Sequence, residues 1–264
     1  MGAFQDGYAA WSEWEPKAYL AEYYQEVMPD ERFAMEFLVE SLRGPGAVPV
    51  ALDFGCGPTV HHLFPLVPKV GEIHLAEYLS GNREEVRRWL DGGSCHDWRP
   101  FALETLRLEG GACGGAAPRA ADAQRRESET RRRVTEVVFA DAGDENPLGP
   151  ERRGFYPLVT THYCAEGATH EKETWRRYMR NIASLVRPGG TLILSACGAA
   201  DHYTVGEHRF PCAGVTGEDV LGSLREHGFV DVDLRVRSVP DHSEQGYGSV
   251  IFARAVRTRG GTIR

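Results

Sequence analysis

The chain has 264 residues, a mass of 29.3 kDa and a formal net charge of −8. This length can bury a sizeable core, and α/β sheets of this size often form one domain, so we expect a single domain over residues 1–264. The acidic balance argues against nucleic acid or an anionic membrane as partner and favours a small-molecule substrate. The chain shows neither a signal-like start nor an apolar run of the roughly 20 residues that a membrane span needs, which predicts a soluble, cytoplasmic protein.

Residues 1–43 carry helical spacing and no strand pattern. Apolar and aromatic residues gather in two groups, Tyr19–Tyr24 and Phe33–Leu42. Pro16 suits the first turn of one helix, and Pro29 suits the boundary to a second. The sequence therefore predicts an N-terminal helical segment whose tyrosines either pack against a sheet or cover a site.

The stretch from Val50 to Thr59 has the pattern of a buried strand followed by a glycine loop. Gly55 and Gly57 allow a sharp turn and a close approach of a ligand to the backbone. Glu77 ends a second predicted strand, 72–77, and lies 20 residues after Gly57. At that distance a carboxylate can accept hydrogen bonds from both hydroxyls of a nucleotide ribose, whereas the alternative is a solvated acid at a strand end.

Strand and helix patterns then alternate to the end of the chain. We expect helices at 60–67, 82–90, 171–186 and 216–228, and strands at 134–140, 155–161, 191–196, 230–239 and 248–256. Asp141 follows the third strand, at the edge where such sheets bind ligands. The last two strands are joined by a loop too short for a helical crossover, so they should be antiparallel. These patterns predict a doubly wound, Rossmann-like, seven-stranded, mostly parallel sheet with an antiparallel C-terminal strand and an N-terminal helical lid.

Residues 92–133 have a weaker pattern and are predicted to be an insertion between strands two and three. A glycine-rich stretch, 110–118, precedes a strongly basic helix, 119–133. No aromatic residues interleave with the basic run, which favours a solvated face over a nucleic-acid site.

The cysteines and histidines give no metal-binding signature. The six cysteines, at 56, 95, 113, 164, 197 and 212, form no CxxC pair and no zinc-site spacing, which predicts free thiols. His61 and His62 are neighbours whose side chains would point in different directions on a helix. The sequence therefore predicts no metal site.

Several motifs together resemble one family. The segment Asp53–Thr59 resembles the cofactor loop of the small-molecule methyltransferases that include nicotinamide, phenylethanolamine and indolethylamine N-methyltransferases. The resemblance extends over nearly the whole chain, through Tyr19–Tyr24, Asn82–Leu90, Asp97–Pro100, Leu185–Gly190 and Tyr203–Phe210.

This resemblance implies that the protein binds S-adenosylmethionine. It implies that the tyrosines of the N-terminal segment close over the cofactor, that the glycine loop supplies backbone contacts, and that carboxylates hold the ribose and the adenine. The implied cofactor residues are Tyr19, Tyr24, Gly55, Cys56, Gly57, Thr59, Glu77 (ribose), Asn82 (methionine or ribose end), Asp141 and Ala142 (adenine), and Thr161 (methionine side).

The acceptor half departs from the family pattern. Ala196 stands where amine-methylating relatives place an acid shortly after strand five, and His61 replaces a family tyrosine. Tyr203 keeps the place of a substrate-side tyrosine. His162 and Tyr163, just past Thr161, are candidates for a general base or for pocket walls.

Three functions fit this pattern. The first is methyl transfer to a small amine or N-heteroaromatic acceptor, in which the protein mainly supplies alignment and desolvation. The second is cyclisation of S-adenosylmethionine itself to azetidine-2-carboxylate and methylthioadenosine, which needs no second substrate and is compatible with the loss of the acid at Ala196. The third is cofactor binding without turnover. None involves nucleic acid or a membrane.

Overall fold

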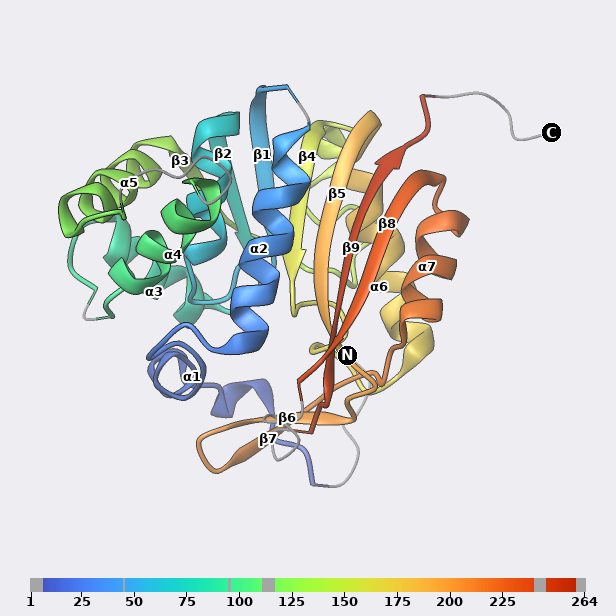
Figure 1. Ribbon diagram of the computed structural model, residues 1–264. Coiled ribbons are helices and arrows are strands. Elements are labelled where there is room, and N and C mark those ends of the chain that lie inside the picture. The colour runs from blue at the N-terminus through green and yellow to red at the C-terminus, as the bar shows by residue number, and fades with distance from the viewer. Residues whose placement is uncertain (1–6, 45, 95, 111–116, 240–245, 260–264) are drawn as a thin grey trace.

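The computed structural model describes residues 7–44, 46–94, 96–110, 117–239 and 246–259 (Figure 1). These residues form a central sheet with helices on both faces and an N-terminal segment at one end of the strands. Within these ranges, none of the helices has the length and apolar character required to cross a membrane. Cys95 and Cys113 lie outside the described residues, and the other four cysteines are free thiols.

The main sheet has seven strands in the order β3-β2-β1-β4-β5-β9-β8. The five strands from β3 to β5 are parallel to their neighbours, and β9 runs antiparallel to both β5 and β8. The predicted doubly wound sheet with an antiparallel C-terminal strand is confirmed. Its strands are β1 (Val48–Phe54), β2 (Val70–Glu77), β3 (Val134–Phe139), β4 (Tyr156–His162), β5 (Val186–Gly198), β8 (Phe229–Ser238) and β9 (Ser249–Arg257).

Helices cover both faces of this sheet. Ala51 and Leu52 are consecutive in β1, and they pack into separate hydrophobic clusters because side chains alternate across a strand. In Figure 1, α2 crosses the near face, whereas α6 and α7 lie behind the sheet. The α-helices are α1 (Pro16–Tyr23), α2 (Pro29–Arg43), α3 (Ser80–Leu90), α4 (Arg99–Gly110), α5 (Ala120–Arg133), α6 (Lys172–Leu185) and α7 (Gly217–Glu226), and the short 3₁₀ helices are η1 (Trp11–Glu13), η2 (His61–Lys69) and η3 (Pro150–Arg152).

The segment after the glycine loop differs from its prediction. An α-helix ending at Pro68 was expected, but η2 is a 3₁₀ helix that contains both Pro65 and Pro68. Neither proline can donate a backbone hydrogen bond, and each ring crowds the carbonyl group four residues earlier, which disfavours an α-helix through this segment.

The region near the start of β5 also differs. Pro188, Gly189 and Gly190 were expected to close the preceding helix, but α6 already ends at Leu185 and the three residues lie within β5. The pairing of β4 with β5 shifts register between Tyr156 and Leu158, which accommodates the irregular start of the strand. A two-stranded hairpin of β6 (His202–Val205) and β7 (His208–Pro211) follows β5 and was not predicted.

The described residues of the predicted insertion between β2 and β3 contribute buried side chains to the core. The basic helix was predicted correctly as α5, but α4 was not predicted. Arg126 is only 8% exposed; it donates hydrogen bonds to the Phe64 carbonyl oxygen at 2.7 Å and to both carboxylate oxygens of Glu109 at 2.8 and 2.6 Å. Arg131 donates to the Trp89 carbonyl oxygen at 2.9 Å. The prediction of a wholly solvated basic face was therefore wrong for these two arginines.

Replacing Arg126 with alanine should destabilise the fold. The change leaves the Glu109 carboxylate without its arginine partner and a buried carbonyl without its donor, which we expect to cost about 2 to 4 kcal/mol. Urea unfolding followed by circular dichroism measures the difference. Arg125→Ala is the matched control on the same helix, because the Arg125 side chain is 65% exposed. Equal effects of the two changes would contradict this account of the insertion.

Candidate active site

The carboxyl ends of β1 to β4 open into a cleft of about 180 Å³, here called the strand-end cleft. It lies where parallel α/β sheets bind ligands. The structure brings thirteen of the predicted site residues to this one cleft. They are Tyr19, Tyr24, Gly55, Cys56, Gly57, Thr59, Glu77, Asn82, Asp141, Ala142, His162, Tyr163 and Tyr203.

Thr161 is the exception among the predicted site residues. It is 3% exposed and is not part of the cleft lining. Its side chain lies next to that of Cys164, which does line the cleft, and its place on the methionine side of the cofactor stays a prediction.

The loop between β1 and η2 is shaped by glycine. Gly55 has φ +71° and Gly57 has φ +59°, a backbone conformation that other residues rarely adopt. A Cβ atom on Gly55 would lie 2.1 Å from Sγ of Cys164 and 2.7 Å from its Cβ, so no side chain fits there. The backbone of this loop is consequently held at the floor of the cleft, where a ligand can approach it closely.

Glu77 is a pre-positioned carboxylate at the end of β2. It accepts hydrogen bonds from the amides of Gly57 at 3.0 Å and Leu79 at 2.7 Å, and from Nδ2 of Asn82 at 3.2 Å. Burial raises the pKa of Glu77, while these three hydrogen bonds act in the opposite direction. The glycine loop and α3 thus fix the orientation of a buried acid that faces the cleft.

The N-terminal segment and Tyr203 form one side of the cleft, here called the aromatic wall. Its residues are Trp14, Tyr19, Tyr24 and Tyr203. Trp14 donates from Nε1 to Oδ1 of Asn82 at 2.8 Å, which ties the segment to α3. The hydroxyls of Tyr19 and Tyr24 lie 3.2 Å apart, and Tyr203 meets the Trp14 ring edge-on. Trp14 was not singled out from the sequence, where the signal available was only its spacing from Trp11 in a predicted helical segment.

A second cavity, of about 290 Å³, lies behind this aromatic wall. The two spaces adjoin, because six residues line both of them. These residues are Trp14, Tyr19, Tyr24, Tyr163, Gly167 and Tyr203. An apolar cavity of about 150 Å³ is enough to hold benzene, so the second cavity has room for a small ring compound. Its walls carry carboxyl groups, including Asp30, Glu31 and Glu166. Among the described residues, neither space is lined by a lysine or an arginine.

Glu166 is the acid that the sequence analysis missed. It is 3% exposed, and its Oε1 accepts a hydrogen bond from the Cys197 amide at 2.9 Å. Cys197 directly follows Ala196, so a neighbouring loop supplies a carboxylate to the strand end where an acid was expected and not found. Burial raises the pKa of Glu166 to about 7. In the sequence, the only indication that Glu166 belongs to the site was its short distance from Tyr163.

Tyr163 lines both spaces, and the preceding residue, His162, lines the strand-end cleft. His162 shares a 2.7 Å hydrogen bond with Ser195 through Nδ1, and burial holds its pKa well below the usual range. Tyr163 has φ +50°, an uncommon conformation for a bulky residue that is often found at functional sites. Burial raises its pKa well above the usual range, so a neutral imidazole and a neutral phenol occupy this position.

Comparison with known proteins identifies the class of this site. A model of the NNMT/PNMT/TEMT family matches residues 3–251. Indolethylamine N-methyltransferase of Oryctolagus cuniculus is 29% identical, and the match covers 92% of each chain. Phenylethanolamine N-methyltransferase of Homo sapiens is 27% identical over 92% of this chain and 87% of that protein. The crystal structure of the [4+2]-cyclase SpnF is similar in fold, with a TM-score of 0.56 and 14% identity over 98% of this chain and 89% of that one.

The chain belongs to the NNMT/PNMT/TEMT family, as its motifs indicated. It is an S-adenosylmethionine-dependent methyltransferase. The strand-end cleft suits this cofactor: the glycine loop lines it, Glu77 can accept hydrogen bonds from hydroxyls, and its aromatic rings suit a positively charged sulfur.

Replacing Glu77 with alanine should weaken cofactor binding. The loss of charge-assisted hydrogen bonds to two hydroxyls is expected to cost roughly 2 to 4 kcal/mol, or about 30- to 1000-fold in the dissociation constant of S-adenosylhomocysteine. Isothermal titration calorimetry measures this dissociation constant. Glu84→Ala, an exposed acid on α3, is the control and should bind as the wild type does. An unchanged dissociation constant for Glu77→Ala would remove Glu77 from the site.

Proposed function

We propose that the protein transfers a methyl group from S-adenosylmethionine to the nitrogen of a small amine, or of an N-heteroaromatic compound, held in the second cavity. The observation that carries this proposal is the cavity itself. It adjoins the strand-end cleft across a shared aromatic wall, and acids line it without a lysine or arginine among the described residues. Two relatives act, by their names, on amines.

The charge of the cavity supports a cationic acceptor. An ammonium group in a poorly solvated space is stabilised by carboxylates and by the faces of aromatic rings. Glu166 supplies a carboxyl group, and Tyr203 and Tyr247 supply rings from the hairpin region and from the segment before β9. An anionic acceptor would meet no compensating charge in this space.

The cofactor residues have separate roles in this proposal. Backbone groups of Gly55, Cys56 and Gly57, with the nearby Thr59, bind the methionine end, and Tyr19 and Tyr24 cover it. Glu77 binds the ribose hydroxyls, assisted by Asn82. Asp141 and Ala142 contact the adenine. When bound, S-adenosylmethionine supplies an electrophilic methyl group on a positively charged sulfur.

Glu166 holds the acceptor and takes its proton. A protonated amine has no lone pair to attack with, so it must lose a proton before methyl transfer. A carboxyl group with a pKa of about 7 is suited to this task, since it can bind the ammonium ion as a carboxylate and accept a proton near neutral pH. His162 and Tyr163 line the boundary as neutral groups and orient the acceptor, and Tyr203 contacts it from the hairpin.

This assignment predicts a pH dependence of acceptor binding. Because the raised pKa leaves Glu166 largely protonated at about pH 6 and largely ionised at about pH 8, the KM for an amine should fall as the pH rises between these values. Initial rates with indolethylamine and phenylethanolamine at saturating S-adenosylmethionine measure it. In Glu166→Gln, KM should rise at least tenfold at about pH 8, and its dependence on pH over this interval should disappear.

The free energy of unfolding of Glu166→Gln is a control for the effect on KM. A carboxyl group with a raised folded-state pKa lowers stability once the pH exceeds its ordinary pKa, so Glu166→Gln should be no less stable than the wild type at about pH 8. Glu173→Gln, at a side chain that is 87% exposed, should leave KM unchanged. The same KM and pH profile in Glu166→Gln and the wild type would contradict the assignment.

Analysis of the reaction products distinguishes methyl transfer from cyclisation of S-adenosylmethionine. Because Glu166 supplies an acid beside Ala196 and the second cavity has room for another molecule, we expect turnover to require an acceptor. Incubation with S-adenosylmethionine alone should yield neither S-adenosylhomocysteine nor methylthioadenosine, whereas addition of an amine panel should yield S-adenosylhomocysteine. Methylthioadenosine formed from S-adenosylmethionine alone, and suppressed in Glu77→Ala, would favour cyclisation instead.

A further inference from the structure

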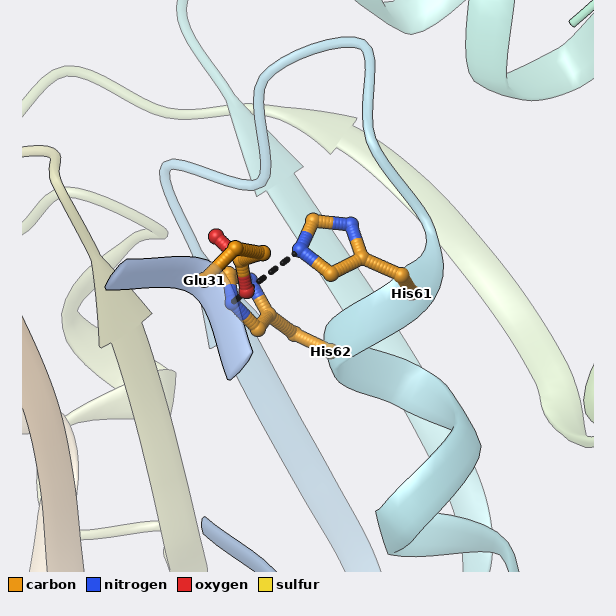
Figure 2. A group of neighbouring side chains, drawn as sticks. All are labelled: Glu31, His61 and His62. Carbon is orange, nitrogen blue, oxygen red and sulfur yellow. Dashed lines mark hydrogen bonds and ion pairs between the residues drawn. The ribbon is translucent and has the colours of Figure 1, made fainter. Parts of the chain in front are cut away.

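Glu31, His61 and His62 form a buried group between the two cavities. Glu31 lies in the first turn of α2 and lines the second cavity, whereas His62, at the start of η2, lines the strand-end cleft. Figure 2 shows both imidazole rings turned toward the same carboxylate. The prediction that the two histidines point in different directions was wrong, because their ring centroids are only 4.0 Å apart and both Nε2 atoms lie 2.9 Å from the same Glu31 oxygen.

The three side chains present one ligand atom each to a common point. Nε2 of His61 and Nε2 of His62 each lie 2.9 Å from Oε1 of Glu31, and the three ligand atoms lie within 4.8 Å of one another. Two atoms that each lie about 2.1 Å from a metal ion are about 3.0 Å apart at a right angle and about 3.4 Å apart at a tetrahedral angle. Each nitrogen–oxygen distance therefore needs to lengthen by only a few tenths of an ångström for the two atoms to become ligands of one metal ion.

His61 provides an independent observation. It is 0% exposed, and neither of its ring nitrogens has a hydrogen bond, because the short contact of Nε2 with Glu31 is poorly aligned for one. Buried polar atoms without partners are rare, and binding of an ion is a common explanation for them. A metal ion would give Nε2 a partner, because a neutral imidazole coordinates a metal through the lone pair of the nitrogen that carries no hydrogen.

Packing holds both imidazoles in place. The His61 ring stacks on Trp98 at 5.2 Å with an interplanar angle of 9°, and the His62 ring stacks on His162 at 3.8 Å. Ligands whose rings are fixed by their surroundings bind metals with little loss of conformational freedom. The remaining charge also favours a cation, since Asp53 is buried near His62 and Glu31 has no lysine or arginine partner within the described part of the chain.

We propose that Glu31, His61 and His62 bind a divalent first-row transition metal, with Zn²⁺ as the natural probe. Two imidazoles and one carboxylate form a ligand set that suits zinc, iron, cobalt and nickel and leaves coordination positions for water or another ligand. The metal would lie between the strand-end cleft and the second cavity. This proposal does not depend on the identity of the acceptor.

Titration of the full chain with Co²⁺ tests the proposal. The protein is freed of metal by chelation and dialysis, and visible absorption then reports the d–d bands of bound cobalt. We expect one Co²⁺ per chain, displaced by one Zn²⁺, and at least a tenfold weaker affinity in Glu31→Gln and in His62→Gln. His74→Gln is the matched control, because His74 is also a buried histidine beside carboxylates, Glu72 at 3.7 Å and Glu136 at 3.5 Å.

Two further measurements keep the outcome decisive. Calorimetric binding of S-adenosylhomocysteine shows whether each variant is folded, and X-ray absorption of the zinc-loaded wild type reports the ligands without any variant. Two imidazoles and no sulfur around zinc would support the proposal. Absence of stoichiometric binding, coordination by cysteine sulfur, or equal affinities in the wild type and in folded Glu31→Gln would overturn it and leave the group as a hydrogen-bonded contact between α2 and η2.

Discussion

The site depends on two buried carboxyl groups, Glu77 and Glu166, in cavities that no lysine or arginine of the described chain lines. Each is less than a tenth exposed. Burying such groups is costly unless hydrogen bonds or a ligand compensate. The fold provides backbone amides for both carboxylates, from Gly57 and Leu79 in one case and from Cys197 in the other. In the proposed function, binding of a cation would offset the remaining cost.

Aromatic residues form the boundary that the two cavities share. Trp14 and Tyr203 line both spaces, and Tyr203 meets the Trp14 ring edge-on. In a space from which water is excluded, attraction between a carboxylate and a cation is stronger than at an exposed surface. In the proposed methyl transfer the two reactants must be aligned and desolvated, and the shared wall would serve that purpose.

Much of this arrangement could be predicted from local sequence patterns. The glycine loop, Glu77 and Asp141 follow predicted strands, and because parallel strands place their carboxyl ends at one edge, their gathering in one cleft follows from the topology. Thr161 does not line the cleft, and the strand pattern alone did not distinguish it from His162, which does. Glu166 and Trp14 could not be found, because loops and the N-terminal segment bring them to the site through contacts distant in sequence. The histidine pair was misjudged because both side chains turn toward Glu31 of α2, a contact between segments that are distant in sequence.

Binding of a charged acceptor and of a neutral analogue tests the central claim most directly. Calorimetric titration of the S-adenosylhomocysteine complex at about pH 8 compares 2-phenylethylamine with 2-phenylethanol, which share a shape and differ in charge. If buried carboxylates recognise a cation, the amine should bind at least tenfold more tightly than the alcohol. Equal or tighter binding of the alcohol would contradict the account.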